Sequence, residues 1–198
     1  MAATSVICLT EGFGDREALP ILVRRIANAY GVYTITILPS IRVPRSALTN
    51  VAGLTRHTEF AANKVGANGA VLVVFDADED CPAELAVRLL PAARSGRADV
   101  AVGLVLAKHE FETWFIAAAE SIAGRRGLPA DFRAPESPEA IRAPKEWLSQ
   151  QMGRERGYKE TTDQPALAAI FDIALARGRS DSFDKFCREV ERLIGAGG

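Results

Sequence analysis

The run VLVVFDADED at residues 71–80 constrains the fold more than any other stretch of the sequence. It begins with five apolar residues, four of them β-branched or aromatic, with no polar residue between them. Such a run is typical of a strand buried on both faces, as in a parallel sheet covered by helices on each side. Acidic residues follow at once, in the loop where open α/β sheets bind their ligands: Asp76, Asp78, Glu79 and Asp80.

The neighbouring segments repeat the order of strand and then helix. Runs at 5–10, 32–38 and 100–107 predict three more strands, and amphipathic segments between Asp15 and Gly31, at 46–64 and at 82–90 predict helices. We therefore expect an α/β protein with a parallel, four-stranded, Rossmann-like sheet, helices on both faces and right-handed crossovers.

Several residues predict where these helices begin and end. Asp15 and Asp80 are placed to cap the helices that follow them, and Pro82 suits a first helical position. A break is expected near Gly53, and Pro91 is expected to help end the helix at 82–90.

Acidic residues follow two of the predicted strands. Because the carboxyl ends of parallel strands meet at one edge, Glu11 after the first strand should lie near Asp76 and Asp78 after the third. Two aspartates at this spacing suit oxygens that converge on one hard cation, such as Mg²⁺ or Mn²⁺. Glu79 and Asp80 are better interpreted as solvated or capping residues.

The segment 108–115 brings further candidates to the same edge. In the helix expected here, Glu110 and Glu112 would lie about 200° apart around the axis, so they should not reach one site together. Glu110 is nearer the strand and is the better candidate for a metal ligand. His109 could be a ligand or base, although a single histidine is more often structural. The aromatic residues that follow are typical of core.

The last third of the sequence predicts a helical extension. Residues 123–137 are rich in Gly, Pro and Arg and indicate a linker, whereas 138–151, with a possible break at Pro144, 164–177 and 182–194 are helical in pattern. We therefore divide the chain into an α/β core at 1–122 and a linker with a helical extension, packed on the core, at 123–198.

Basic residues in three places could contact a phosphate group. Arg42 and Arg45 lie in the predicted loop 39–45, Arg154 and Lys159 lie in the polar stretch 153–159, and Lys108 follows the last predicted strand. For both loops the alternative is a solvated segment without a specific role.

Composition limits the classes of function. With 48% hydrophobic residues and a net charge of −1, the chain is typical of a globular protein that does not bind nucleic acid by bulk electrostatics, although a local basic groove remains compatible. Cys8, Cys81 and Cys187 are odd in number and match no zinc spacing, which indicates reduced thiols and a cytoplasmic location. No targeting segment or membrane-spanning run is expected.

The arrangement of EGFGD after an opening strand and VVFDAD about sixty residues later resembles the Toprim superfamily, the metal-dependent domain of topoisomerases, primases and OLD-type nucleases. The match covers roughly residues 5 to 110. The HEFETWF stretch and the segment from Tyr158 and Lys159 to Asp163 are similar to a small bacterial Toprim-like family, often encoded beside ATPases in apparent phage-defence operons.

This resemblance implies a Mg²⁺-dependent (or Mn²⁺-dependent) nuclease acting on nucleic acid, with DNA the expected substrate and an ATPase the expected partner. Asp76 and Asp78 would hold the metal, Glu11 would be a metal ligand or general acid/base, and Glu110 would complete the shell. Lys159, Lys108 or an arginine would stabilise developing charge. A topoisomerase is disfavoured because no separate domain with a nucleophilic tyrosine is visible.

Two alternatives remain open. VLVVFDADED also resembles the DxDx[TV] loop of haloacid-dehalogenase-like phosphatases, in which Asp76 would be the nucleophile and Asp78 a general acid. The position of Asp80 departs from that loop. The chain could instead be a non-catalytic regulatory or interaction subunit of an ATPase, with the acidic site vestigial or only metal-binding.

Overall fold

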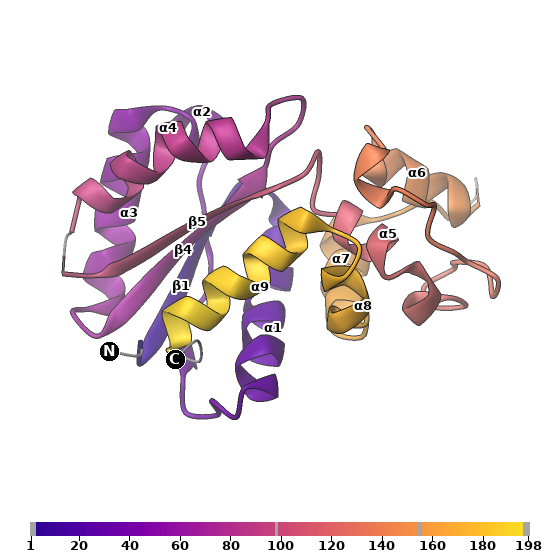
Figure 1. Cartoon of the computed structure of the whole chain (residues 1–198), viewed down its shortest axis with the longest axis horizontal. Helices are drawn as coiled ribbons and strands as arrows, with labels where there is room; N and C mark the ends of the chain where they lie inside the picture. The colour runs from indigo at the N-terminus through magenta and orange to yellow at the C-terminus, as the bar shows by residue number, and fades with distance from the viewer. Residues whose placement is uncertain (1–2, 98, 154–155, 196–198) are drawn as a thin grey trace.

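A computed structural model describes residues 3–97, 99–153 and 156–195 (Figure 1). Its sheet is parallel throughout and has the strand order β2 (Thr36–Ile37), β1 (Ser5–Thr10), β4 (Gly69–Asp76) and β5 (Ala101–Ala107), with β3 (Ile41–Arg42) also paired to β1. The predicted parallel α/β fold is confirmed. The sheet has five strands rather than four, because the predicted strand 32–38 shortens to two residues and β3 forms within the predicted loop.

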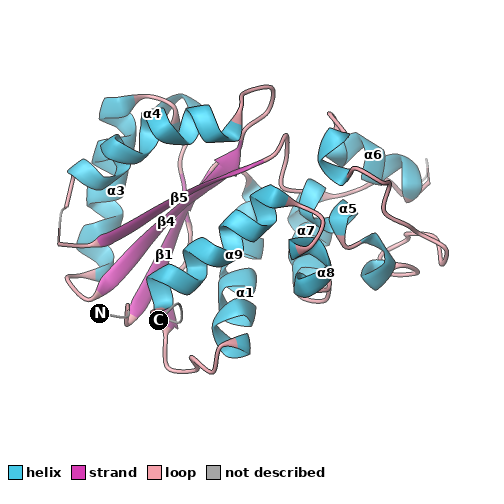
Figure 2. Ribbon diagram, viewed as in Figure 1, coloured by secondary structure: helices cyan, strands magenta, loops and turns pink. Residues whose placement is uncertain are grey.

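Helices cover both faces of the sheet, as Figure 2 shows. Alternate side chains of each strand point to opposite faces, so that Val6 and Cys8 pack in one hydrophobic cluster while Ile7 and Leu9 pack in another. α1 (Phe13–Ala29) and α9 (Asp181–Ile194) cover the first face, and α3 (Val51–Val65) and α4 (Pro82–Ser95) cover the second.

Some predicted helix boundaries are wrong. α1 begins at Phe13 with Gly12 as its N-cap, so Asp15 lies inside the first turn, although its carboxylate does accept the Gly12 N–H at 3.1 Å. α4 has Cys81 rather than Asp80 as its N-cap, and it continues through Pro91. Burial of the residues after Pro91 outweighs the one backbone hydrogen bond that a proline removes.

The predicted break near Gly53 lies slightly earlier. α2 (Arg45–Leu48) ends before α3 begins, and the Asn50 side chain caps α3 by accepting the Gly53 N–H. Gly53 is required for close packing of the two helices, since a Cβ there would lie 2.6 Å from the Ala47 carbonyl oxygen.

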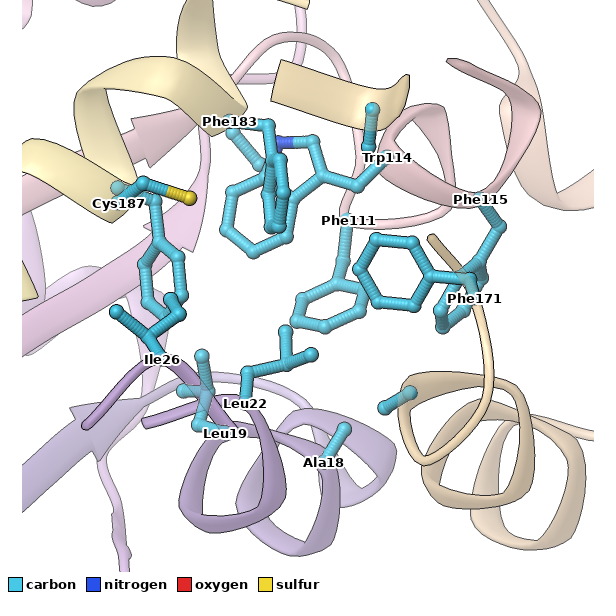
Figure 3. Close-up of a cluster of buried hydrophobic side chains, with 14 of the residues drawn as sticks. Ala18, Leu19, Leu22, Ile26, Phe111, Trp114, Phe115, Phe171, Phe183 and Cys187 are labelled. Atoms are coloured by element: carbon cyan, nitrogen blue, oxygen red, sulfur yellow. The ribbon is translucent and has the colours of Figure 1, made fainter. Parts of the chain in front are cut away.

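The predicted core ends with α5 (Thr113–Ala117) and the 3₁₀ helix η1 (Ala119–Ile122), and the predicted extension begins with an irregular segment, as expected. Next come the 3₁₀ helix η2 (Pro138–Ala140), α6 (Pro144–Gln151), α7 (Glu160–Ala168) and α8 (Ile173–Arg177). α9 packs on β5, as expected, whereas α7 packs on α1 rather than on the sheet. Figure 3 shows buried aromatic side chains of the extension against α1, so both parts of the chain share one core.

A buried carboxylate that pairs with two arginines fixes the start of α7. The Asp163 carboxylate is fully buried, accepts the Lys159 N–H at 2.9 Å and pairs with Arg126 and Arg156. Burial alone would raise the pKa of Asp163, but the hydrogen bonds from Arg156, Lys159 and Arg126 lower it. Asp163 therefore has a structural role.

We expect Asp163→Asn to lower the free energy of unfolding by about 3 kcal/mol, because it leaves two arginines without their buried partner. Urea denaturation at pH 7.5 measures the loss. Asp184→Asn is the control, since Asp184 pairs with Arg177 and Arg188 at a more exposed position and should cost less than about 1 kcal/mol. Equal losses in the two variants would contradict the structural role.

Candidate functional site

The strand order indicates one place at the edge of the sheet as a candidate site. The chain leaves β1 toward β2 and β3 on one side, and later returns to place β4 on the other side of β1. Open α/β sheets bind ligands at such a switch point, outside the carboxyl ends of the two strands. Glu11 directly follows β1, and Asp76 is the last residue of β4. The expected convergence at this edge is therefore present in the fold.

Arg45, the first residue of α2, lies at the centre of the outer part of this site. Its guanidinium contacts the carboxylates of Glu11 at 3.3 Å, Asp78 at 3.0 Å and Asp80 at 3.7 Å, and donates to the Asp76 carbonyl oxygen at 2.6 Å. One arginine thus forms ion pairs with three carboxylates. Burial still raises the pKa of Glu11, although Arg45 opposes the shift.

Asp76 lies near a second group of charged side chains, called here the inner cluster, which includes Asp15, Glu112 and Lys145. Its Oδ1 accepts the Phe111 N–H at 2.9 Å. The pKa of Asp76 is well above its usual value, first because of burial and then because Asp15 and Glu112 lie nearby. The two aspartates of the DxD motif are therefore divided between two clusters.

Asp15 is held in place by three donors. Its carboxylate accepts hydrogen bonds from the Thr10 hydroxyl at 2.9 Å, the Gly12 N–H and the Gln164 side-chain amide of α7. Its pKa is raised by burial, against the effect of these hydrogen bonds. Gln164, in the predicted extension, thus orients Asp15, in the predicted core.

Lys145 of α6 is the cation of the inner cluster. Its Nζ lies 3.3 Å from Glu160, and its backbone N–H donates to Glu110 at 2.8 Å. Burial raises the pKa of Glu112 to about 7, Lys145 opposes this rise, and Asp15 and Glu110 add to it. Burial would also raise the pKa of Glu160, but hydrogen bonds from Gly14 and Lys145 lower it.

Three buried polar atoms at this cluster have no partner. Glu112 Oε1, the Tyr158 hydroxyl and Gln164 Oε1 make no hydrogen bond of acceptable geometry with any described residue. Burial, and then the neighbouring Glu112, raise the pKa of Tyr158 well above its usual value. Orphaned buried oxygens beside excess negative charge indicate a place for a ligand, an ion or water.

The profile of a domain family of unknown function, DUF4276, matches residues 10–191. This chain belongs to the DUF4276 family. The match includes every residue of both clusters, from Glu11 to Gln164, so the extension is part of the DUF4276 domain. Comparisons with curated proteins and with solved structures gave no match.

The structure corrects one expectation about this DUF4276 site. Glu110 and Glu112 were expected to diverge on opposite sides of a helix, but α5 begins only at Thr113, so both precede it and both lie near Lys145. Glu112 is 1% exposed and belongs to the inner cluster. Glu110, expected to be a metal ligand, accepts a backbone N–H in the first turn of α6.

The remaining residues that the sequence analysis singled out have other surroundings. His109 adopts a positive φ of 59° and its Nδ1 contacts the Asp78 carbonyl at 3.0 Å, which favours a structural role. Glu79 lies 3.9 Å from Arg142 and is mostly exposed. The Lys159 side chain is exposed, while its backbone binds Asp163. Arg154 lies outside the described residues.

The donor set of this DUF4276 site fits a hard divalent cation. Carboxylate oxygens are the ligands that Mg²⁺ prefers. Burial raises the pKa of Glu11, Asp76 and Glu112, so a bound cation would stabilise their ionised forms. Within the described ranges, however, no three acidic, histidine or cysteine side chains stand in coordinating geometry. Arg45 contacts the oxygens of Glu11 and Asp78 instead.

Proposed function

We propose that this chain is a metal-dependent nuclease that hydrolyses nucleic-acid phosphodiester bonds. The observation that carries the proposal is the gathering of four carboxylates near the β1–β4 switch point: Glu11, Asp15, Asp76 and Glu112. Asp15 and Glu112 are buried, and the pKa of all four is raised. The resemblance of the Glu11 and Asp76–Asp78 motifs to the Toprim superfamily supports the same reaction.

Asp76 would hold the cation, Mg²⁺ or Mn²⁺, together with Glu11 and Asp78 once these two carboxylates release Arg45. Bound there, the ion would lower the pKa of a water molecule and neutralise charge at the phosphate. Arg45 would contact a phosphate oxygen once its carboxylate partners are occupied. Glu112, with a pKa of about 7, is suited to accept a proton near neutral pH, and the charge of Lys145 favours its ionised form.

The proposal extends to partner and location. An ATPase encoded beside the gene, in phage defence, follows from the Toprim-like resemblance. Cys8, Cys81 and Cys187 are free thiols, which favours a reducing compartment such as the cytoplasm. None of the described helices combines the length and apolar character needed to cross a bilayer.

We expect the protein to degrade labelled DNA in Mg²⁺ or Mn²⁺ and to be inactive in EDTA. Gel analysis of single-stranded and duplex DNA and RNA, incubated with wild type and with Glu11→Gln, tests this. Glu17→Gln, an exposed acid of α1, is the control and should remain fully active. Metal binding by calorimetry without cleavage of any substrate would favour the ATPase-subunit alternative, and phosphate trapped on Asp76 would favour the phosphatase.

A further inference from the structure

An exposed aromatic ring lies beside the candidate site. Phe13 is the first residue of α1, two residues beyond Glu11, and 56% of its surface is exposed. The Arg42 guanidinium stacks over this ring, with its carbon 4.0 Å from the ring centroid. Arg42 is itself anchored, because its Nε donates to the Glu11 carbonyl oxygen at 2.9 Å.

The fold fixes this pair at the edge where the acids gather. Arg42 ends β3 and pairs in register with Thr10, the residue before Glu11. The backbone of Glu11 therefore joins the stacked pair directly to the outer cluster around Arg45. Phe13 and Arg42 together, called here the stacking pair, present a flat aromatic surface and a planar cation next to the proposed reacting phosphate.

We infer that the stacking pair binds an unpaired nucleobase, so that the preferred substrate is single-stranded nucleic acid. This inference rests on the proposed function and specifies its substrate class. A base in a duplex has both faces covered by its neighbours, whereas an unpaired base can stack on an aromatic ring or a guanidinium plane. The near-neutral net charge agrees with binding through local stacking rather than through a broad basic surface.

The chain supplies a matched control for this pair. Phe60 on α3 is 51% exposed, and the Lys64 ammonium lies over its ring at 4.9 Å. Phe60 is therefore comparable to Phe13: both have the same ring, a similar exposed fraction and a cation over the ring. α3 leads into the amino-terminal end of β4, so Phe60 is separated from the carboxyl edge where the stacking pair lies.

The test measures the Kd of a fluorescein-labelled thymidine dodecamer and of a labelled duplex by fluorescence anisotropy, with Ca²⁺ in place of Mg²⁺. Phe13→Ala should bind the single strand roughly tenfold more weakly, since stacking on an aromatic ring contributes about 1–3 kcal/mol per base. Phe13→Trp should retain binding, and Phe60→Ala should match wild type. Duplex binding should change less than about twofold in every variant.

Unchanged single-strand binding by Phe13→Ala, or equal losses for the single strand and the duplex, would overturn the inference. If wild type still cleaves DNA in either case, the proposed nuclease function stands. If wild type binds neither nucleic acid, both the inference and the proposed function are wrong. Circular dichroism of Phe13→Ala confirms that any loss does not come from unfolding.

Discussion

Asp76→Asn should remove metal binding and lower the rate of DNA cleavage by at least about 10³-fold, equal to about 4 kcal/mol of transition-state stabilisation. Asp76 is the acid that ends β4 at the switch point, and it lies near the inner cluster. Asparagine keeps an oxygen that can accept the Phe111 N–H, so the backbone of 108–112 should stay in place. The change therefore removes charge with little change in shape.

The same variant should be more stable than wild type when metal is absent. Burial and the neighbouring acids raise the pKa of Asp76, so the folded state favours the neutral form and ionisation at pH 7.5 works against folding. Calorimetric Mg²⁺ titration, cleavage rates and thermal melting in EDTA measure the three effects. Asp99→Asn is the control, an exposed acid just before β5 at the other edge of the sheet. Full cleavage by Asp76→Asn would refute the assignment.

The second large effect concerns pH. Glu112 is 1% exposed and its pKa rises from 4.5 to about 7 in the folded state. An acid whose pKa is raised by folding binds more protons when folded. The contribution of Glu112 to the free energy of unfolding is therefore complete below about pH 4.5 and is lost as pH rises toward 7. At 1.36 kcal/mol per pKa unit, this loss reaches about 3 kcal/mol at most.

We therefore expect the metal-free wild type to lose stability between pH 4.5 and 7, and Glu112→Gln to reduce that slope. Urea denaturation across this range in EDTA measures it. Glu17→Gln, at an exposed position, should leave the slope unchanged. Saturating Mg²⁺ should also reduce the loss, because a cation stabilises ionised carboxylates. A slope that is identical in wild type and Glu112→Gln would show that this carboxylate is not a buried acid.

Much of the fold was predictable because the sheet depends on local signals. The apolar run before Asp76 predicts a strand buried on both faces, and the order of strands and helices predicts a parallel sheet. β2 and β3 were harder, since each has only two residues and pairs with part of β1. α4 continues past Pro91 because tertiary burial outweighs a local breaker.

The positions of Glu11 and Asp76 were predictable for the same reason, since Glu11 directly follows β1 and Asp76 ends β4. The inner cluster was missed because Lys145, Glu160 and Gln164 are far from Asp15 in sequence and reach it only through the packing of α6 and α7. One signal for this packing is present in the sequence at Gly14. A Cβ at Gly14 would lie 2.0 Å from the Gln164 side-chain oxygen, so this glycine makes room for α7.

The contact between α1 and α7 has a consequence for the order of events during synthesis. Asp15 leaves the ribosome early, whereas Gln164 and Glu160, which fix the same corner of the molecule, emerge about 145 residues later. A chain that ends before α7 lacks the two side chains that fix this corner. The proposed nuclease would therefore become active only after α7 had been made.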